Sequence, residues 1–442
     1  MISRRKFIQT TSLAGTCFLL TPEISKAGFF SGSPNNKVVL GMMGTNSRGL
    51  YLAQRFAGMP NVEIGYICDV DSKVVENTIN EIFKITGKKP KGITDIRKML
   101  EIKEIDAVVI AAPDHWHAPA TIMACQAGKH VYVEKPGSHN PHEGEMAVAA
   151  SKKYKRLVQM GIQRRSFANV QNMIKELHNG VIGRTYYAKG WYTNHRQTIG
   201  YGKEVAVPET LNYDLWQGPA PRMAYRDNLI HYNWHWLWNW GAGEALNNGT
   251  HELDVMRWGL GVDFPNKVVS TGGRFHFNDD WQTPDTQNIM YNFPNNTAAQ
   301  WESRSCNGFE MEKLGRGVIF YGDKGTLVYD GGNGYQVYDG GNKPVKSVND
   351  NTKVDATNKV SPTELLDELH LKNFIEAIRG SERLNCSIET GFKSTLLPQL
   401  GNISYRVDRV LQIDPSNGHI LNDADAAKLW SREYEKGWEV KV

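Results

Sequence analysis

The sequence predicts an α/β protein in which a doubly wound parallel sheet precedes an α+β domain with an open, mainly antiparallel sheet. Short apolar segments alternate with helical segments between residues 38 and 160, and glycines mark the turn after the first of them. After Gly161 the apolar segments lengthen and alternate with polar residues, as strands with one covered face do. We therefore expect a first domain over residues 34–160 and a second over residues 161–442, whose last helices could pack back on the first domain.

The first domain is expected to alternate strands and helices. The strands are Val38–Met43, Val62–Cys68, Asp106–Ala112, His130–Glu134 and Leu157–Met160. The helices are Asp71–Thr86, Ala118–Ala127 and Pro141–Tyr154, and a further helix-compatible stretch follows Gly49. Helices that connect successive strands make the strands parallel, and ligands then bind at the carboxyl ends of the strands.

The second domain is expected to be built mainly from strands joined by turns rich in Gly, Asn and Asp. The strands are Thr185–Tyr192, Lys267–Phe277, Thr286–Phe293, Ala298–Ser303, Gly317–Tyr321 and Thr326–Tyr329. Two helical stretches, Glu252–Gly259 and Glu364–Arg379, interrupt or close the series, and the polar residues 340–360 are expected to form a surface excursion.

The glycine turn after the first strand has the layout of a dinucleotide site of the Rossmann type. Gly44 permits a tight turn, Gly49 lets the next helix pack closely, and the amino end of that helix faces the pyrophosphate. Asp69 ends the second strand and would bind both ribose hydroxyls, while its charge would repel a 2′-phosphate, which favours NAD. Asn46 replaces the usual middle glycine and tolerates positive φ. The expected cofactor contacts here are Gly44, Thr45, Asn46, Arg48, Gly49 and Asp69, and an ordinary Gly-rich turn is the alternative.

Residues 1–27 have the pattern of a twin-arginine export signal. Arg4 and Arg5 precede an apolar stretch from Leu13 to Leu20, and Ser25-Lys26-Ala27 offers a cleavage site. A basic tail and an uncleaved anchor are the alternatives. Because this route exports folded proteins, the pattern predicts a periplasmic protein of a bacterium whose nucleotide is held tightly and travels with it.

Composition narrows the possible partners. The formal charge of +4 falls to about +1 when four positive charges and one negative charge leave with the signal, and no basic arm indicates nucleic-acid binding. The remaining cysteines are too scattered for a disulfide framework or zinc site, and the close histidine pairs lack a third ligand, so no metal is expected. No segment of the mature chain is long and apolar enough to cross a membrane, and exposed aromatics favour a homo-oligomer.

Four sequence blocks in order carry a family resemblance. They are Ala112–His117, the tetrapeptide Val133–Pro136, Gln159–Arg165 and Asn248–Gly259. Over nearly the whole mature chain the sequence resembles the Gfo/Idh/MocA oxidoreductases. The resemblance implies a nicotinamide cofactor and a carbohydrate or cyclitol substrate between the two domains. It adds further cofactor contacts at Pro113, His115, His117, Glu134 and Lys135.

The resemblance also implies two catalytic residues, Lys135 and His251, which flank the substrate hydroxyl. A neutral imidazole can take a hydroxyl proton near pH 7, and a lysine can polarise the oxygen or act as a base if burial lowers its pKa. Asn247 stands where many members carry aspartate, and it cannot accept a proton. Glu244, Asp254 or Tyr232 could supply what the missing aspartate would give. The alternatives are a surface lysine for Lys135 and a capping or core histidine for His251.

Residues 231–240 are rich in aromatic side chains, whose flat faces suit sugar C–H surfaces. Tyr232, Trp234, His235 and Trp236 are the expected substrate contacts in this segment, and an aromatic core or an oligomer contact is the alternative. Arg164 and Arg165 follow a strand end and could face substrate or cofactor, or equally form structural ion pairs.

These features lead to an NAD-dependent oxidoreductase that acts on a ring hydroxyl of a sugar or sugar derivative. The first rival is a glycosidase that uses NAD transiently, as relatives within this superfamily do: oxidation to a ketone, elimination of the aglycone, water addition and reduction. Those relatives have an altered Glu-Lys-Pro block, whereas this chain retains Lys135, so the oxidoreductase ranks first. A carbohydrate- or nucleotide-binding protein without catalysis ranks third.

Overall fold

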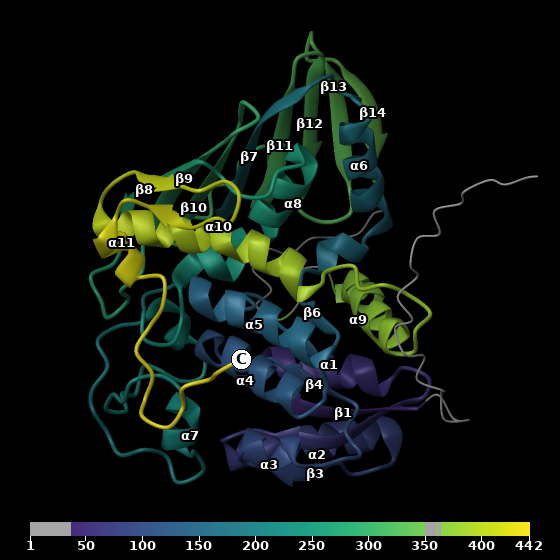
Figure 1. Ribbon diagram of the computed structural model, residues 1–442, viewed down its shortest axis with the longest axis vertical. Coiled ribbons are helices and arrows are strands. Elements are labelled where there is room, and N and C mark those ends of the chain that lie inside the picture. Colours follow the sequence, from purple (N-terminus) through teal and green to yellow (C-terminus); the bar gives the residue numbers. More distant parts are fainter. Residues whose placement is uncertain (1–36, 350–359, 361–363) are drawn as a thin grey trace, which may run out of the picture.

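The computed structural model describes residues 37–349, 360 and 364–442 (Figure 1). The expected export signal, residues 1–27, lies outside these described residues. The described chain contains two sheets, one of six strands and one of ten (Figure 1). Its helices include none with the length and apolar character needed to span a membrane.

The six-stranded sheet is parallel and has the strand order β3-β2-β1-β4-β5-β6. Its strands are β1 (Val38–Met43), β2 (Val62–Cys68), β3 (Lys91–Ile93), β4 (Ala107–Ile110), β5 (His130–Val133) and β6 (Val158–Met160). The helices that connect them are α1 (Ser47–Ala57), α2 (Ser72–Thr86), α3 (Ile96–Leu100), α4 (Asp114–Gln126) and α5 (Pro141–Tyr154). The order reverses between β1 and β4, which is the point where doubly wound sheets bind ligands. The predicted doubly wound sheet is confirmed.

Helix α4 begins at Asp114, four residues before the predicted start at Ala118. Its first turn therefore contains residues that were expected to precede the helix. Pro119 lies inside α4 and has no N–H to donate to the carbonyl oxygen of His115. That oxygen instead accepts a hydrogen bond from Nη2 of Arg432 at 2.6 Å, so a contact distant in sequence replaces the missing helical bond.

The ten-stranded sheet has the order β14-β13-β12-β11-β7-β10-β9-β8-β15-β16. Only β7 and β10 pair in parallel among its described strands, which confirms the mainly antiparallel prediction. The strands are β7 (Thr185–Thr193), β8 (Lys267–Gly273), β9 (Thr286–Phe293), β10 (Thr297–Arg304), β11 (Arg316–Gly322), β12 (Gly325–Tyr329), β13 (Tyr335–Asp339), β14 (Pro344–Val348), β15 (Leu411–Ile413) and β16 (Ile420–Leu421). Strand β14 lies within the segment expected as a surface excursion, and its residues are mostly exposed.

The second part of the chain contains more helix than the two predicted stretches. Its helices are α6 (Ala168–His178), α7 (Tyr213–Gln217), α8 (Thr250–Leu260), α9 (Glu364–Ile378), α10 (Ile388–Val407) and α11 (Ala424–Lys428). Helix α10 was not predicted, because Pro398 and Gly401 interrupt its helical pattern. A Cβ at Gly401 would lie 2.4 Å from a methyl group of Ile289, so this glycine lets the helix lie close to β9.

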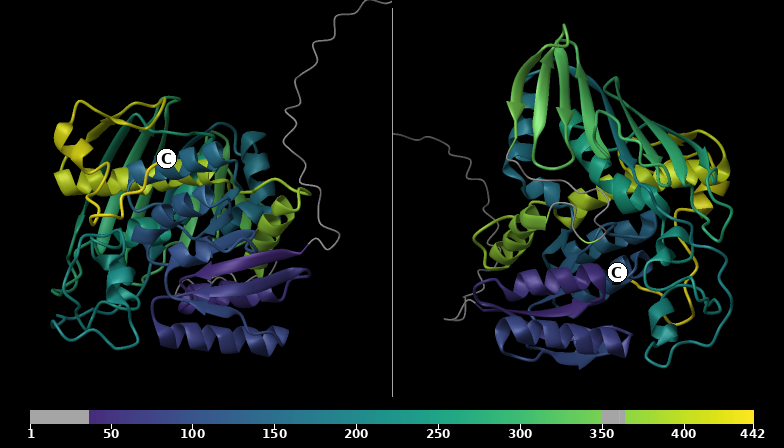
Figure 2. Two further views of the ribbon diagram at one scale, coloured as in Figure 1. Left: turned by 60° about the horizontal axis from the view of Figure 1, so that its bottom comes forward. Right: turned by 180° about the vertical axis from the view of Figure 1, so that it is seen from behind.

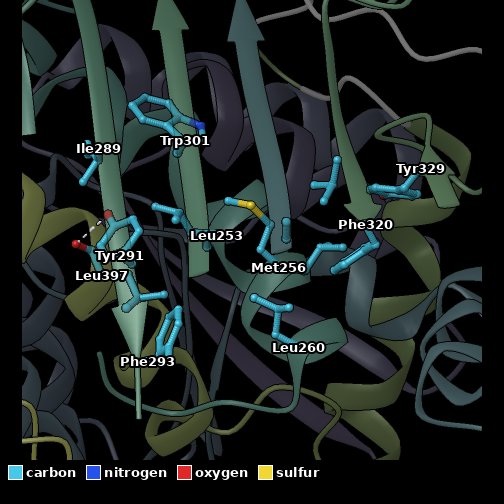
Figure 3. Packing of buried hydrophobic residues seen from close by; sticks show 14 of the residues in the cluster. Leu253, Met256, Leu260, Ile289, Tyr291, Phe293, Trp301, Phe320, Tyr329 and Leu397 are labelled. Atoms are coloured by element: carbon cyan, nitrogen blue, oxygen red, sulfur yellow. Dashed lines mark hydrogen bonds between the residues drawn. The ribbon is translucent and has the colours of Figure 1, made fainter. Parts of the chain in front are cut away.

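Helices α8 and α10 cover one face of the ten-stranded sheet, and their apolar side chains form its core (Figure 3). Leu253 and Met256 of α8 lie among Ile289, Trp301 and Phe320 of the strands (Figure 3). Full burial of one such side chain contributes about 1.5–3 kcal/mol. This packing fixes the amino end of α8, where the candidate catalytic residues lie.

Helix α9 returns to the first sheet, and Figure 2 shows it beside the amino-terminal strands. Its buried residues Leu371, Phe374 and Ile375 pack with Phe56 and Tyr132 of the first domain. Asp367 of the same helix pairs with Arg48, which follows the turn after β1. Helix α9 therefore supports the sheet and one wall of the cleft.

Candidate active site

One cleft lies at the carboxyl ends of β1, β2, β4 and β5 and extends to the amino end of α8. Of the residues predicted to contact cofactor or substrate, it is lined by Gly44, Asn46, Arg48, Asp69, Pro113, His117, Glu134, Lys135, Arg164, Tyr232, Trp234, His235, Asn247 and His251. The cleft thus brings together the two predicted halves, the glycine turn and the Lys135–His251 region.

The glycine turn has the shape that a dinucleotide needs. Gly44 has φ +75°, and a Cβ there would lie 2.6 Å from the backbone nitrogen of Ala112. A Cβ on Gly49 would lie 1.8 Å from the carbonyl oxygen of Gly44, so α1 can start this close to β1 only with glycine. The turn does not use the tolerance of Asn46 for positive φ: Asn46 has φ −71° and precedes the helix, while Ser47 has φ +40°. The helix amino end opens on the cleft, which fits a pyrophosphate.

Asp69 is held in place by two backbone N–H groups. Its Oδ2 accepts a hydrogen bond from Thr45 at 2.7 Å, and its Oδ1 accepts one from Asp71 at 3.1 Å. Burial raises the pKa of Asp69, and the two N–H groups oppose that rise. The carboxylate lines the cleft at the end of β2, where a ribose would lie. Thr45 and Gly49, two of the predicted cofactor contacts, do not line the cleft themselves.

Arg48 connects three elements around the turn. Its Nε lies 2.8 Å from Glu134 after β5, and its Nη1 lies 2.5 Å from Asp367 of α9. Both carboxylates raise the pKa of Arg48 against the effect of burial. The guanidinium predicted as a cofactor contact is therefore already engaged by two carboxylates, although it still lines the cleft.

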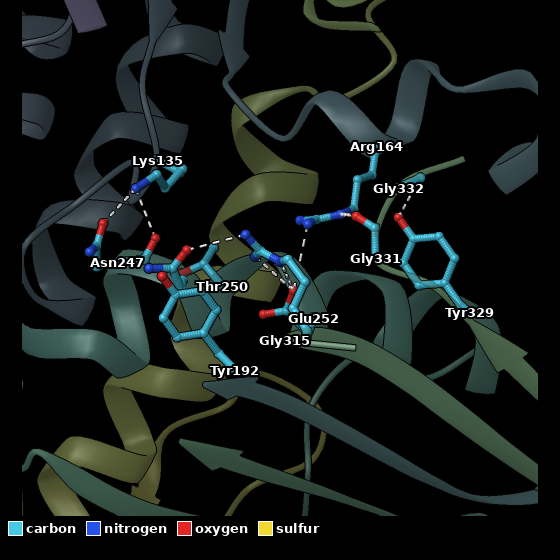
Figure 4. Close-up of polar contacts among 12 residues, drawn as sticks. Lys135, Arg164, Tyr192, Asn247, Thr250, Glu252, Gly315, Tyr329, Gly331 and Gly332 are labelled. Carbon is cyan, nitrogen blue, oxygen red and sulfur yellow. Dashed lines mark hydrogen bonds and ion pairs between the residues drawn. The ribbon is translucent and has the colours of Figure 1, made fainter. Parts of the chain in front are cut away.

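Lys135 points across the cleft to the second domain (Figure 4). Its Nζ donates to the backbone oxygen of Asn247 at 2.8 Å and to the side-chain oxygen of the same residue at 2.9 Å. Burial lowers the pKa of Lys135, while Glu134 and Asp114 oppose this effect. The two bonds leave one of its three N–H groups for another acceptor.

Asn247 lies in a single π-helical turn, Ala245–Gly249, that leads into α8. Its Nδ2 donates to Oε1 of Glu244 at 3.3 Å, and the other carboxylate oxygen of Glu244 accepts from Nε of Arg196 at 2.6 Å. Arg196 also donates to the hydroxyl oxygen of Tyr232 at 2.8 Å. Of the three residues suggested to supply what the missing aspartate would give, Glu244 and Tyr232 are therefore both hydrogen-bonded to Asn247. Asp254 instead pairs with Arg165 at 2.8 Å.

His251 lies four residues after Asn247, in the first turn of α8. Its pKa is well below the ordinary value, because the ring is buried and because the charges of Arg164, Arg316 and Lys135 oppose protonation. Its Nδ1 is buried and has no hydrogen-bond partner among the described residues. The cleft therefore holds a neutral imidazole beside a lysine, which is a pair suited to moving a hydroxyl proton.

Three predicted contacts belong to the protein core and do not line the cleft. The Nε2 of His115 lies 2.9 Å from the backbone oxygen of Trp216, and Trp236 stacks on Trp281 with a ring separation of 4.1 Å. Arg165 pairs with Asp254 inside the second domain. Each assignment came from a motif whose neighbouring residue faces the cleft, and sequence alone does not separate the two sides of one turn.

The cleft also contains five charged residues that were not predicted from the sequence: Asp95, Asp114, Arg196, Arg316 and Asp367. Burial raises the pKa of Asp114 to about 7, and the charge of Lys135 opposes this rise. Asp114 stands in the block Ala112–His117, directly after a strand end, and that position could have identified it. Arg196 and Arg316 are brought to the cleft by tertiary contacts alone.

Family models match both parts of the chain. The model described as "Oxidoreductase family, NAD-binding Rossmann fold" matches residues 38–162. The model described as "Oxidoreductase family, C-terminal alpha/beta domain" matches residues 175–409, which is more than half of the chain.

Similar proteins include glycosidases. A glycosyl hydrolase family 109 protein of Saccharopolyspora erythraea is 26% identical over 204 residues, 43% of this chain and 44% of that protein. An alpha-N-acetylgalactosaminidase of Shewanella oneidensis is 35% identical over 109 residues, 24% of each chain. The chain thus spans less than half the length of these curated relatives.

Solved structures share the fold at low sequence identity. Levoglucosan dehydrogenase in complex with NADH and levoglucosan is 17% identical with a TM-score of 0.66, over 85% of this chain and 99% of that one. A putative myo-inositol dehydrogenase from Sinorhizobium meliloti is 17% identical with a TM-score of 0.61, over 86% of this chain and 100% of that one. These structures have the same two-sheet architecture, and the two family models show that the chain belongs to the Gfo/Idh/MocA oxidoreductase family, with an NAD-binding Rossmann domain at its amino end.

Proposed function

We propose that this protein is an NAD-dependent oxidoreductase that acts on a ring hydroxyl of a sugar or sugar derivative. The observation that carries the proposal is the position of Lys135, whose Nζ is held by Asn247 at 2.8 and 2.9 Å beside His251 in the cleft. Gly44, Gly49 and Asp69 would hold NAD, and NAD when bound supplies the acceptor for the hydride of the carbinol carbon.

The residues of the chain handle the proton. The third N–H of Lys135 donates to the substrate hydroxyl oxygen and stabilises the negative charge that develops there. His251 accepts the hydroxyl proton at Nε2, because its Nδ1 is buried and its ring is neutral. Glu244 orients Asn247, and Asn247 in turn orients Lys135, so a neutral amide does the positioning that many relatives leave to an aspartate.

A glycosidase that returns the hydride within each cycle is the second candidate. One observation favours it: the similar proteins from Saccharopolyspora erythraea and Shewanella oneidensis carry glycosidase names. The retained Lys135 keeps the oxidoreductase first. Both reactions begin with the same oxidation, so the residues above serve either one.

The test uses purified protein with its bound nucleotide. Denaturation should release NAD, and incubation with a panel of sugars should give a keto-sugar detectable by mass spectrometry. Aryl glycosides separate the candidates: free aglycone without accumulated NADH supports the glycosidase, and a stable keto-sugar supports the oxidoreductase. A preparation that neither carries nor binds NAD would reject both.

We also propose that the protein leaves the cytoplasm folded, with NAD bound, and works in the periplasm as a homo-oligomer. Support comes from the two arginines and the apolar stretch within residues 1–27 and from exposed aromatic residues such as Tyr201 and Phe309. Cell fractionation of the chain and of an Arg4→Lys/Arg5→Lys variant tests the export. Light scattering of the purified protein tests the assembly.

A further inference from the structure

Two arginines in the substrate half of the cleft share a single carboxylate. Arg164 follows β6 and Arg316 begins β11, and both side chains are almost fully buried although they line the cleft. Nη2 of Arg316 lies 2.7 Å from Oε1 of Glu252, and Nη2 of Arg164 lies 3.6 Å from the same oxygen. Figure 4 shows Glu252 beside Arg164, with Lys135 at the other end of the drawn contacts. Nε of Arg164 also donates to the backbone oxygen of Gly331 at 2.9 Å.

Each of the other cations of the cleft has at least one acidic side chain nearby. Arg196 pairs with Glu244 at 2.6 Å. Arg48 contacts both Glu134 and Asp367. The ammonium of Lys135 lies within the field of Glu134 and Asp114, both of which favour its charged form. Arg164 and Arg316, by contrast, are two cations on the substrate side of the cleft that share the one carboxylate of Glu252.

The two guanidinium groups also influence the pKa of neighbouring groups. The pKa of Arg164 is lowered, first by burial and then by the charge of Arg316. Both arginines also lower the pKa of His251, and all three residues line the same cleft. A buried cation without a full counter-charge is costly, and an anion that completes the pairing is stabilised there. Guanidinium groups suit planar anions, because their N–H groups match two oxygens of one carboxylate.

We infer that the sugar accepted by this cleft carries an anionic group, with a uronate carboxylate as the form that best fits Arg164 and Arg316. The inference rests on the proposed function, since it places the reacting hydroxyl at Lys135 and His251. It adds an orientation: the carboxylate faces the second domain at the arginines, and the carbinol carbon faces the nucleotide half of the cleft. A sulfate or phosphate ester of a sugar presents the same charge to the same groups, and the experiment separates these sources.

The test is calorimetric binding to the NAD-loaded protein with matched pairs of ligands. D-glucuronate is compared with D-glucose, and D-galacturonate with D-galactose, while glucose 6-sulfate and glucose 6-phosphate form two further arms. We expect at least one anionic sugar to bind about tenfold or more tightly than its neutral partner, with a preference that weakens as salt rises. Tighter binding of the sulfate or phosphate ester than of either uronate would identify the anionic group as that ester and overturn its assignment as a uronate. Equal or tighter binding of every neutral sugar, or no binding by any anionic one, would overturn the inference as a whole.

Arginine variants locate the charge. Arg164→Gln should reduce the preference for the anionic sugar by about tenfold or more, and Arg164→Lys should retain part of it. The control is Arg184→Gln, because Arg184 is exposed and does not belong to the lining residues. NAD content and the near-UV circular dichroism spectrum identify a variant that fails to fold. If Arg164→Gln fails to fold, Arg164→Lys is compared with the unchanged protein instead.

The binding experiment also separates this inference from the proposed function. A keto-sugar formed from neutral sugars without any preference for anions would leave the oxidoreductase standing and remove the anionic substrate. Tight binding of an anionic sugar that Arg164→Gln abolishes, with no keto-sugar from any substrate, would leave the anionic ligand standing and remove the oxidoreductase.

Discussion

The ammonium nitrogen of Lys135 lies 2.8 Å from the backbone oxygen of Asn247 and 2.9 Å from its side-chain oxygen. One residue of the second domain thus holds the lysine of the first domain by two hydrogen bonds. The backbone bond would persist in any substitution that keeps the π-helical turn, while the side-chain bond depends on the amide. The contributions of the backbone bond and the side-chain bond can therefore be tested separately.

Replacing Lys135 by methionine should lower kcat by about 10²–10⁴-fold, because a positioned acid–base group contributes about that factor. Methionine keeps much of the length and apolar volume of lysine, so NAD content should remain at the level of the unchanged protein. Keto-sugar formation measured at saturating substrate checks the rate. Turnover near the original value would remove Lys135 from the chemistry.

Asn247→Asp should move the alkaline limb of the pH–rate profile to higher pH. A carboxylate next to Nζ favours the ammonium form, and it thereby opposes the effect of burial on the pKa of Lys135. The new charge also faces Glu244, whose oxygen now accepts from the amide, so the melting temperature should fall. Asn248→Asp is the matched control, since the Asn248 amide also donates to Glu244 but lies outside the pair of bonds that hold Lys135. Profiles that superimpose would contradict the role assigned to Asn247.

Asp114 gives a prediction for stability against pH. Its pKa in the folded protein is about 7 because of burial, whereas the ordinary value is 3.8. Between these values the folded protein holds a proton that the unfolded chain has lost, so the contribution of Asp114 to stability falls as pH rises from about 4 to about 7. Asp114→Asn should remove this decrease, so the stability of the variant relative to the unchanged protein should be about 4 kcal/mol more favourable at pH 8 than at pH 4. Thermal unfolding of both proteins across this range checks the difference, and parallel curves would refute it.

Asp69→Ser should change the choice of nucleotide. The charge of Asp69 repels a 2′-phosphate, and a loss of about 1.4 kcal/mol of repulsion corresponds to about tenfold in relative affinity for NADP. The serine cannot reproduce both hydrogen bonds with Thr45 and Asp71, so the affinity for NAD should fall as well. Mass spectrometry of the nucleotide released after incubation with both forms measures the ratio. An unchanged ratio would mean that another group selects the nucleotide.

Local patterns were sufficient to predict many of the elements. The bounds of β1, β2 and α5 match their predictions, because a buried apolar run or a capping residue marks each end. Helix α10 could not be predicted in the same way, since the advantage of Gly401 lies in its contact with Ile289 of another element. Where a residue supports a helix through a contact with another element, the local sequence pattern looks unfavourable for that helix.

The same distinction applies to the site. Lys135 and His251 stand in short motifs, so both could be named from the sequence alone. The ion pair of Arg196 with Glu244 joins residues that are 48 positions apart, and Arg316 meets Glu252 from 64 positions away. Neither arginine is distinguished in sequence from a solvated one. Their pairing, and the sharing of Glu252 by Arg164 and Arg316, arise only in the folded chain.

The bond between Arg432 and the carbonyl oxygen of His115 has a consequence for biosynthesis. Arg432 also pairs with Glu143 of α5 at 2.6 Å, and Trp438 meets Trp116 of α4 edge to face with a ring separation of 5.2 Å. Helices α4 and α5 of the nucleotide domain therefore contact side chains that are synthesised about 300 residues later. We therefore expect a ribosome-stalled fragment that ends before residue 430 to remain sensitive to protease at α4 and α5.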